Sequence, residues 1–198
     1  MKYLAIAGVA SLALLAACNQ GGDSAGQNTN EAVNATQDAT AGAVGQTSAM
    51  TMGANTVDGF VTGLGTGNMY ELEAAKVAEA KSANADVKAL AAMITKDHTA
   101  AGEKLGAAQA TAAPNVAIPT TLDERRKGMI DNLNAATPGD FDKVYLTQQV
   151  AAHNETLTLL NGFSDNTEAP ALATLARELV APVTMHRDRA QALLDAMK

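Results

Sequence analysis

The chain of 198 residues has few of the residues that stabilise small exported domains or large aromatic cores. It contains one cysteine and therefore no internal disulfide, although an exported protein could form one. It contains no tryptophan, three phenylalanines and three tyrosines. A core built mainly from alanine, leucine, valine and methionine is therefore expected, and this composition suits closely approaching helices better than a β-sandwich.

Positive charge is also scarce. The chain has 14 basic and 21 acidic residues and a net charge of −7. Removal of residues 1–17 as a signal peptide would take away one lysine and leave a net charge of −8. Such a chain has no electrostatic reason to bind nucleic acid or an anionic lipid surface, so no nucleic-acid partner is expected.

The N-terminus has the pattern of a secretory signal. Lys2 precedes an apolar run from Leu4 to Leu15, which is too short to span a membrane as a helix. The run ends in Leu-Ala-Ala-Cys at Cys18, which resembles a bacterial lipobox. We therefore expect residues 1–17 to be a lipoprotein signal peptide and Cys18 to be lipidated. The alternative is plain cleavage after Ala-x-Ala, which leaves a spare thiol.

The expected lipid predicts where the protein lies. Acyl chains on Cys18 would attach the chain to a membrane, because several chains anchor stably where one does not. The next residue is Asn19, and by resemblance to enterobacterial lipoproteins this favours the outer membrane over the inner one. We therefore expect an outer-membrane lipoprotein of the cell envelope, with its domain facing the periplasm.

A polar segment follows the cysteine. Residues 19–50 are almost entirely Asn, Gln, Gly, Ser, Thr and Ala, with three acids and no base. Such a composition buries too little apolar surface to offset the entropy of ordering. Residues 18–54 are therefore predicted to be a lipidated cysteine and a disordered tether, with a reach of about 30 Å for a flexible chain of this length.

From about residue 55 onward, apolar residues recur at helical spacing, and no segment has the period of a strand. The pattern predicts an all-α domain over residues 55–198, an antiparallel four-helix bundle with one short extra helix between helices two and three. The four long helices are predicted over residues 56–81, 85–111, 139–163 and 169–197, and the short one over residues 122–133.

The three histidines are the most specific feature of this domain. His98, His153 and His186 each continue the apolar stripe of a different predicted helix, and Glu71 interrupts the stripe of the first helix. At 1.5 Å per residue, Glu71, His98 and His153 lie about 18, 22 and 20 Å from the nearest predicted turn. His186 lies about 30 Å from its turn, which argues against a neat four-ligand site.

Three interpretations of this cluster stay open: a metal site, a buried polar cluster and a histidine-based response to pH. Imidazole and carboxylate ligands suit iron, zinc, nickel or copper(II), so the residues could hold one transition-metal ion. In this interpretation Glu71, His98, His153 and His186 are candidate ligands. The candidate supporting residues around them are Asp97, Gln149 and Glu178. The alternative is a buried polar cluster whose members satisfy one another's hydrogen bonds.

Several segments of the domain resemble a bacterial family called domain of unknown function 4142 (DUF4142). The resemblance covers about residues 55–197 and implies a ferritin-like four-helix bundle, often exported, with no established reaction. Ferritin-like di-iron proteins carry Glu-x-x-His motifs, but Thr95, Val150 and Val183 stand three residues before the histidines. The segments that carry the resemblance are Glu71-Leu72-Glu73, Asp86-Val87-Lys88, Met93-Ile94-Thr95-Lys96-Asp97-His98, Gln148-Gln149-Val150-Ala151-Ala152-His153 and the late His186.

No catalytic motif is present, so no reaction can be assigned. The first functional hypothesis is a lipid-anchored envelope protein whose bundle has a structural, interaction or stress-related role with another envelope protein. The second is a metal-binding or metal-dependent redox protein that uses iron, zinc or copper in the inner cluster. The second hypothesis requires the cluster residues to converge within a few ångströms, whereas mutual hydrogen bonds among them would favour the first.

Overall fold

The computed structural model describes residues 36–40, 42–45 and 55–197. Within these ranges all regular structure is helical, which confirms the predicted all-α class. No helix in the described ranges is long and apolar enough to cross a membrane. Cys18 and the predicted signal peptide lie outside the described residues. The labelled helices are α2 (Val57–Lys81), α3 (Ala85–Ala112), α4 (Glu124–Ala135), α5 (Phe141–Phe163) and α6 (Pro170–Asp195).

Polar side chains fix the starts of three of these helices. The Thr56 hydroxyl accepts a hydrogen bond from the Gly59 amide at the start of α2. The Asn84 side chain accepts from two amides at the start of α3, and the Asp123 side chain caps α4. Each cap satisfies backbone donors that have no partner within the helix. The helix boundaries therefore follow local chemistry that is visible in the sequence.

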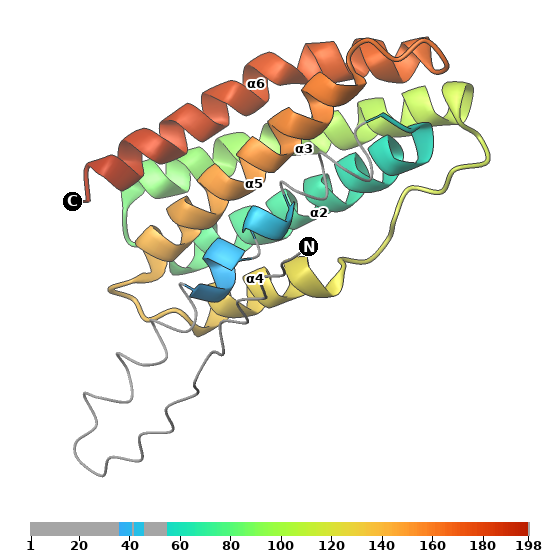
Figure 1. Cartoon of the computed structure of the whole chain (residues 1–198). Coiled ribbons are helices and arrows are strands. Elements are labelled where there is room, and N and C mark those ends of the chain that lie inside the picture. Colours follow the sequence, from blue (N-terminus) through green and yellow to red (C-terminus); the bar gives the residue numbers. More distant parts are fainter. Residues whose placement is uncertain (1–35, 41, 46–54, 198) are drawn as a thin grey trace, which may run out of the picture.

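The four long helices lie side by side (Figure 1). The short turns at residues 82–84 and 164–169 make α2–α3 and α5–α6 antiparallel hairpins, and the hairpins pack through α2 against α5 and α3 against α6. The connection from α3 crosses the molecule and leads into α4, which packs against α2 and α5. The short helix is thus present where the sequence predicts it, and it covers one side of the bundle.

The apolar core consists of two separate clusters. One contains Phe60, Leu105, Leu160 and Leu172, and the other contains Leu90, Ile94, Tyr145, Leu146 and Leu133. Along α3, α5 and α6 a histidine lies between the residues of one cluster and the residues of the other. The bundle therefore has a polar layer across its middle, between two apolar halves.

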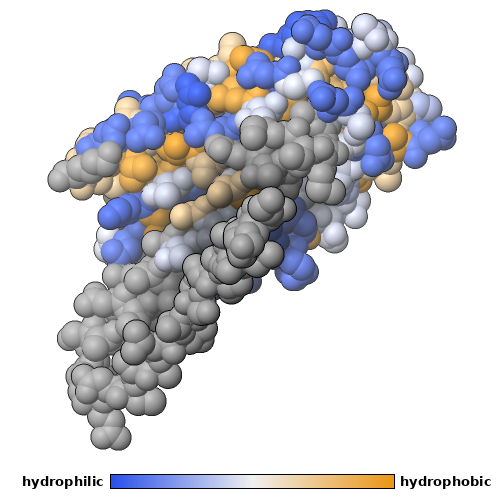
Figure 2. Space-filling model, in the orientation of Figure 1, coloured by the Kyte–Doolittle hydropathy of each residue, from blue (hydrophilic) through white to orange (hydrophobic). Residues whose placement is uncertain are grey.

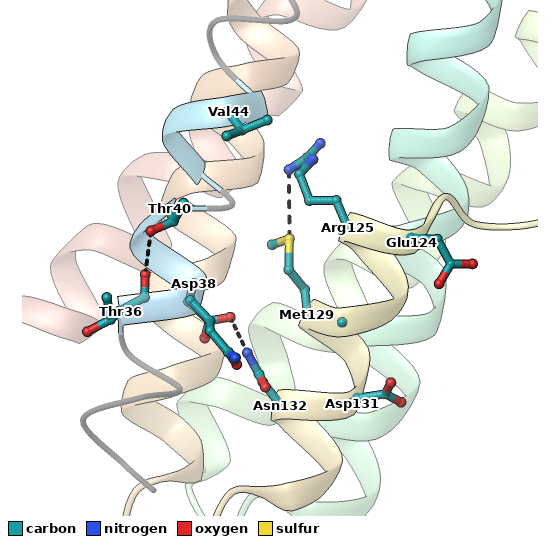
Figure 3. Close-up of a pocket in the computed structure, with 11 residues that line it drawn as sticks. Thr36, Asp38, Thr40, Val44, Glu124, Arg125, Met129, Asp131 and Asn132 are labelled. Atoms are coloured by element: carbon teal, nitrogen blue, oxygen red, sulfur yellow. Dashed lines mark hydrogen bonds between the residues drawn. The ribbon is translucent and has the colours of Figure 1, made fainter. Parts of the chain in front are cut away.

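Residues 36–40 and 42–45 are helical, although the sequence predicts a disordered tether there. They lie beside α4 and α5 (Figures 1 and 3), and we call them the strap. Asp38 is 5% exposed and accepts hydrogen bonds from Asn132 Nδ2 (2.8 Å) and Gln148 Nε2 (2.9 Å). Gly45 packs so closely that a Cβ atom there would overlap the Glu155 carboxylate. The strap is held by polar bonds and close backbone approach, which a prediction based on apolar content cannot detect.

The strap forms one wall of a groove of about 630 Å³, and α4 forms the other (Figure 3). Val44 lies at this groove and is 49% exposed. Among the described residues, the exposed large hydrophobic residues are Val44, Met185 and Met197. Figure 2 shows apolar residues scattered among hydrophilic ones on the visible face.

We predict that Asp38→Ala lowers the free energy of unfolding by about 1–3 kcal/mol, because it leaves the half-buried amide of Asn132 and the buried amide of Gln148 without their carboxylate. Urea unfolding followed by circular dichroism measures the change. Asp131→Ala is the matched control, since Asp131 is exposed on α4 and lines the same groove. Equal unfolding midpoints for Asp38→Ala and the parent would show that Asp38 does not hold the strap.

Candidate metal centre

Three helices bring the three histidines together. His98 comes from α3, His153 from α5 and His186 from α6, and the ring centroids lie 5.4–5.7 Å apart. One ligand nitrogen from each ring lies within 4.8 Å of the others. The side chains are almost completely buried, with residue exposures of 6%, 1% and 1%. This is the one such three-residue group among the residues that the structure describes.

Each ring is held through one of its two nitrogens. All three partners are oxygen atoms that accept hydrogen bonds, so the bonded ring nitrogen carries the proton and the other nitrogen presents a lone pair. The bonds join His98 Nδ1 to Asn68 Oδ1 (3.0 Å), His153 Nδ1 to the Gln149 carbonyl (2.9 Å) and His186 Nε2 to Asp97 Oδ2 (3.0 Å).

The remaining nitrogens are buried and have no hydrogen-bond partner among the described residues. They are His98 Nε2, His153 Nε2 and His186 Nδ1. A cluster of histidines with a purely structural role would pair these atoms with one another or with neighbouring donors. Instead, each ring keeps one free, buried nitrogen, and one nitrogen of each ring lies within 4.8 Å of the others. Metal-binding histidines oriented by surrounding acceptors have this pattern.

Burial keeps these rings neutral. It lowers the pKa of His153 to about 4 and is the main cause that lowers the pKa values of His98 and His186. The neighbouring histidines lower the last two further, while Asp97 opposes the change at His186. At neutral pH the three rings are therefore unprotonated at the free nitrogen, as metal coordination requires.

Glu71 lies beside this group, on α2. It is 2% exposed, its Oε1 lies 3.5 Å from His153 Nδ1, and its Oε2 has no hydrogen-bond partner among the described residues. Burial raises the pKa of the Glu71 carboxyl group to about 8. The adjacent Gln149 side chain opposes this rise, but the two groups make no hydrogen bond of ordinary geometry. The structure thus brings Glu71 to the histidines but leaves it outside the three-nitrogen group.

The predicted supporting residues have different positions. Asp97 binds His186, and the Gln149 carbonyl binds His153. Glu178 lies away from the cluster, where it forms a 3.0 Å ion pair with Lys104, and both side chains are more than half exposed. The sequence analysis named Glu178 as a candidate supporting residue, but its side chain points to solvent.

The depth argument against His186 was wrong, since His186 lies with the other two histidines. The depth argument considered only the positions of the Cα atoms along each helix. A helical side chain leans toward the N-terminus of its own helix. Because α5 and α6 are antiparallel, His153 leans away from their shared turn and His186 leans toward it, so the two rings approach each other.

Sequence reasoning assigned no site role to Asn68 or Tyr145. Asn68 stands one turn before Glu71 on α2 and orients His98. Tyr145 stands four residues before Gln149, which stands four residues before His153, so all three share one face of α5. Extending the histidine stripe by whole turns would have found Tyr145, whereas the Asn68 bond depends on how α2 and α3 pack.

These features define an all-α protein with a buried site of three neutral imidazoles. The chain belongs to the family Domain of unknown function (DUF4142), whose family model matches residues 39–193. The match begins within the strap, so these residues are part of the family domain. No curated protein and no solved structure matches the chain. The ferritin-like arrangement implied by the sequence resemblance therefore stays a prediction.

We predict that Glu71→Gln stabilises the metal-free protein in a pH-dependent way. The folded protein keeps the Glu71 proton up to about pH 8, whereas the unfolded chain loses it near 4.5. Between these values the folded state binds more protons, so the free energy of unfolding falls as the pH rises. Glutamine has no such proton to lose. The variant should therefore melt higher than the parent, with a larger margin at pH 8 than at pH 5.

Thermal melts in a chelator at both pH values measure this margin. We expect several degrees at pH 8, since one pKa unit is about 1.4 kcal/mol and each kcal/mol shifts the melting temperature by about 2–4 °C. Glu73→Gln is the control, because Glu73 is exposed on the same helix. A margin equal at the two pH values would contradict the burial of an un-ionised Glu71.

Proposed function

We propose that this protein binds one divalent transition-metal ion through His98, His153 and His186. The observation that carries the proposal is the convergence of three buried imidazole rings, each of which keeps one nitrogen without a hydrogen-bond partner among the described residues. An unsatisfied buried polar atom costs about 1–3 kcal/mol, and three in one place need a common partner. A metal ion accepts all three lone pairs at once.

The surrounding groups fit this ligand. Asn68, Asp97 and the Gln149 carbonyl orient the rings from behind, and such partners are typical of metal-binding histidines. The carboxylates of Asp97 and Glu71 would together balance two positive charges in an otherwise apolar core. Three imidazoles with nearby carboxylates suit zinc, iron, copper(II) or nickel.

The burial of the cluster favours metal binding or a redox role over hydrolysis of large substrates. The three histidines and Glu71 are each no more than 6% exposed. A metal held there would be shielded from any molecule much larger than a few atoms. The alternative hypothesis, a bundle that only docks on an envelope partner, has less support, because the exposed large apolar residues among those described are few.

We also propose a lipid-anchored position in the cell envelope, at the outer membrane and facing the periplasm. This part of the proposal rests on the sequence of residues 1–19, with its apolar run and small residues before Cys18. The anchor would keep a metal-binding domain beside the membrane. The two parts are independent, so either can fail without the other.

We predict that the full chain takes up about one metal ion and that His98→Ala/His153→Ala takes up none. The protein is made without a histidine tag and with Cys18→Ser, which removes its only thiol. It is incubated with zinc, iron(II), copper(II) or manganese, desalted and analysed for metal. Binding should also raise the melting temperature, since a metal at about 100 times its Kd stabilises by about 2.7 kcal/mol.

Tyr70→Phe is the control for stability. It removes a buried 2.9 Å hydrogen bond to Gln148 without removing a histidine, so it should lower stability and leave metal uptake intact. If the parent retains no metal and the double variant is merely less stable, the histidines only fill a polar layer of the core and the metal proposal is wrong.

For the anchor, we predict that Cys18→Ala abolishes lipid attachment and releases the protein from membranes, because the thiol is the acceptor of the lipid. Metabolic labelling with a radioactive fatty acid, followed by membrane fractionation, measures both effects. A Cys18→Ala chain that still carries covalent lipid would show that the attachment site lies elsewhere.

A further inference from the structure

The buried histidines are separated from solvent by four sides of the bundle, one between each pair of long helices that pack together: α2–α3, α3–α6, α5–α6 and α2–α5. The two apolar clusters lie beyond the histidines in both directions along the bundle. A metal ion must therefore cross one of the four sides. A cation crosses most readily where the local charge is negative and the side chains reach water.

Packing covers the two sides that α2 forms. On the α2–α5 side, Arg126 of α4 bonds Glu155 of α5 (2.6 Å), and a Cβ atom added at Gly67 of α2 would lie 3.8 Å from the Arg126 guanidinium group. On the α2–α3 side, a Cβ atom added at Gly102 would lie only 3.0 Å from Asn68 Nδ2. The first side is therefore closed by a cationic side chain, and the second by a neutral amide packed against the α3 backbone.

The α5–α6 side carries a positive charge. Arg189 binds Asp86 of α3, and Arg187, two residues earlier, points about 160° away from it around α6. Arg187 pairs with its neighbour Asp188 (2.6 Å). Burial is the main cause of the low pKa of His153, and the charge of Arg187 lowers this pKa further. A cation that approached the histidines from this side would be repelled in the same way.

The α3–α6 side carries a negative charge that reaches water. The Asp97 side chain is 30% exposed and accepts a 3.0 Å hydrogen bond from His186 Nε2, although the His186 side chain is only 1% exposed. Asp97 also directly precedes His98 in α3. Within the described ranges it is the one acidic side chain that both bonds a histidine of the cluster and is partly open to solvent.

We propose that the metal ion enters and leaves the histidine site between α3 and α6, with the Asp97 carboxylate as its first contact; this rests on the proposed metal site. A cation that reaches Asp97 competes for the oxygen that holds His186 Nε2, and the released ring is free to turn. The His186 ring centroid lies 5.6 Å from that of His98 and 5.4 Å from that of His153. One ring therefore links the partly exposed carboxylate to the two inner ligands.

Stopped-flow absorbance of cobalt(II) binding to the metal-free full chain, with Cys18→Ser, tests this route. Asp97→Asn removes the charge but keeps an oxygen that accepts from His186. We expect this variant to bind cobalt about three- to tenfold more slowly at low ionic strength, because the local attraction for the cation is lost. Added salt should slow the parent more than Asp97→Asn. Asp97→Glu keeps the charge and should keep the salt dependence of the parent.

Glu178→Gln is the matched control, since it removes a carboxylate from the same side of the bundle that pairs with Lys104 rather than with a histidine. It should bind cobalt at nearly the parent rate. If it slows binding as much as Asp97→Asn does, the effect is one of overall charge and the route is wrong. If Asp97→Asn binds at the parent rate and only releases cobalt faster to a chelator, Asp97 merely orients His186, and the route is wrong while the metal site stands. If the parent binds no cobalt, the proposed function fails, and the route fails with it.

Discussion

The structure depends on a polar layer that crosses the middle of an apolar bundle. Three histidines, Glu71 and Gln149 lie between two hydrophobic clusters, and all are almost fully withdrawn from solvent. Placing such groups in a core is costly unless each finds a partner. Asn68, Asp97 and one backbone carbonyl satisfy half of the ring nitrogens. Two of these bonds join α3 to α2 and to α6, and the third lies within α5.

The two apolar halves on either side of this layer differ in side-chain composition. The half near the α5–α6 turn is rich in leucine and contains the stacked rings of Phe60 and Phe163. The half on the other side of the polar layer contains many alanines and is completed by α4, through Met129 and Leu133. The short helix is therefore a structural part of the domain, and it also provides the surface on which the strap lies.

Much of this fold could be predicted from the sequence, because helical periodicity and the Asn84 cap are local signals. The inward direction of the three histidines could be predicted for the same reason. Their exact partners could not, since the Asn68 and Asp97 bonds depend on the rotation of one helix against another. The predictions for Glu178 and for the depth of His186 failed because distance along a helix does not say where a side chain points. The strap was missed because Asp38 and Gly45 contribute little apolar surface.

The strap has a mechanical consequence. It lies between the N-terminal residues and the rest of the domain, and Asp38 ties it to Asn132 on α4 and Gln148 on α5. A pull on the chain from the N-terminal side would load these two hydrogen bonds before it reached α2. Gln148 also bonds Tyr70, and both residues are sequence neighbours of the polar layer, through Gln149 and Glu71. Tension on the N-terminus would therefore be transmitted first to the helices α4 and α5, and it would reach α2 from the side, through Tyr70, before it reached the start of that helix.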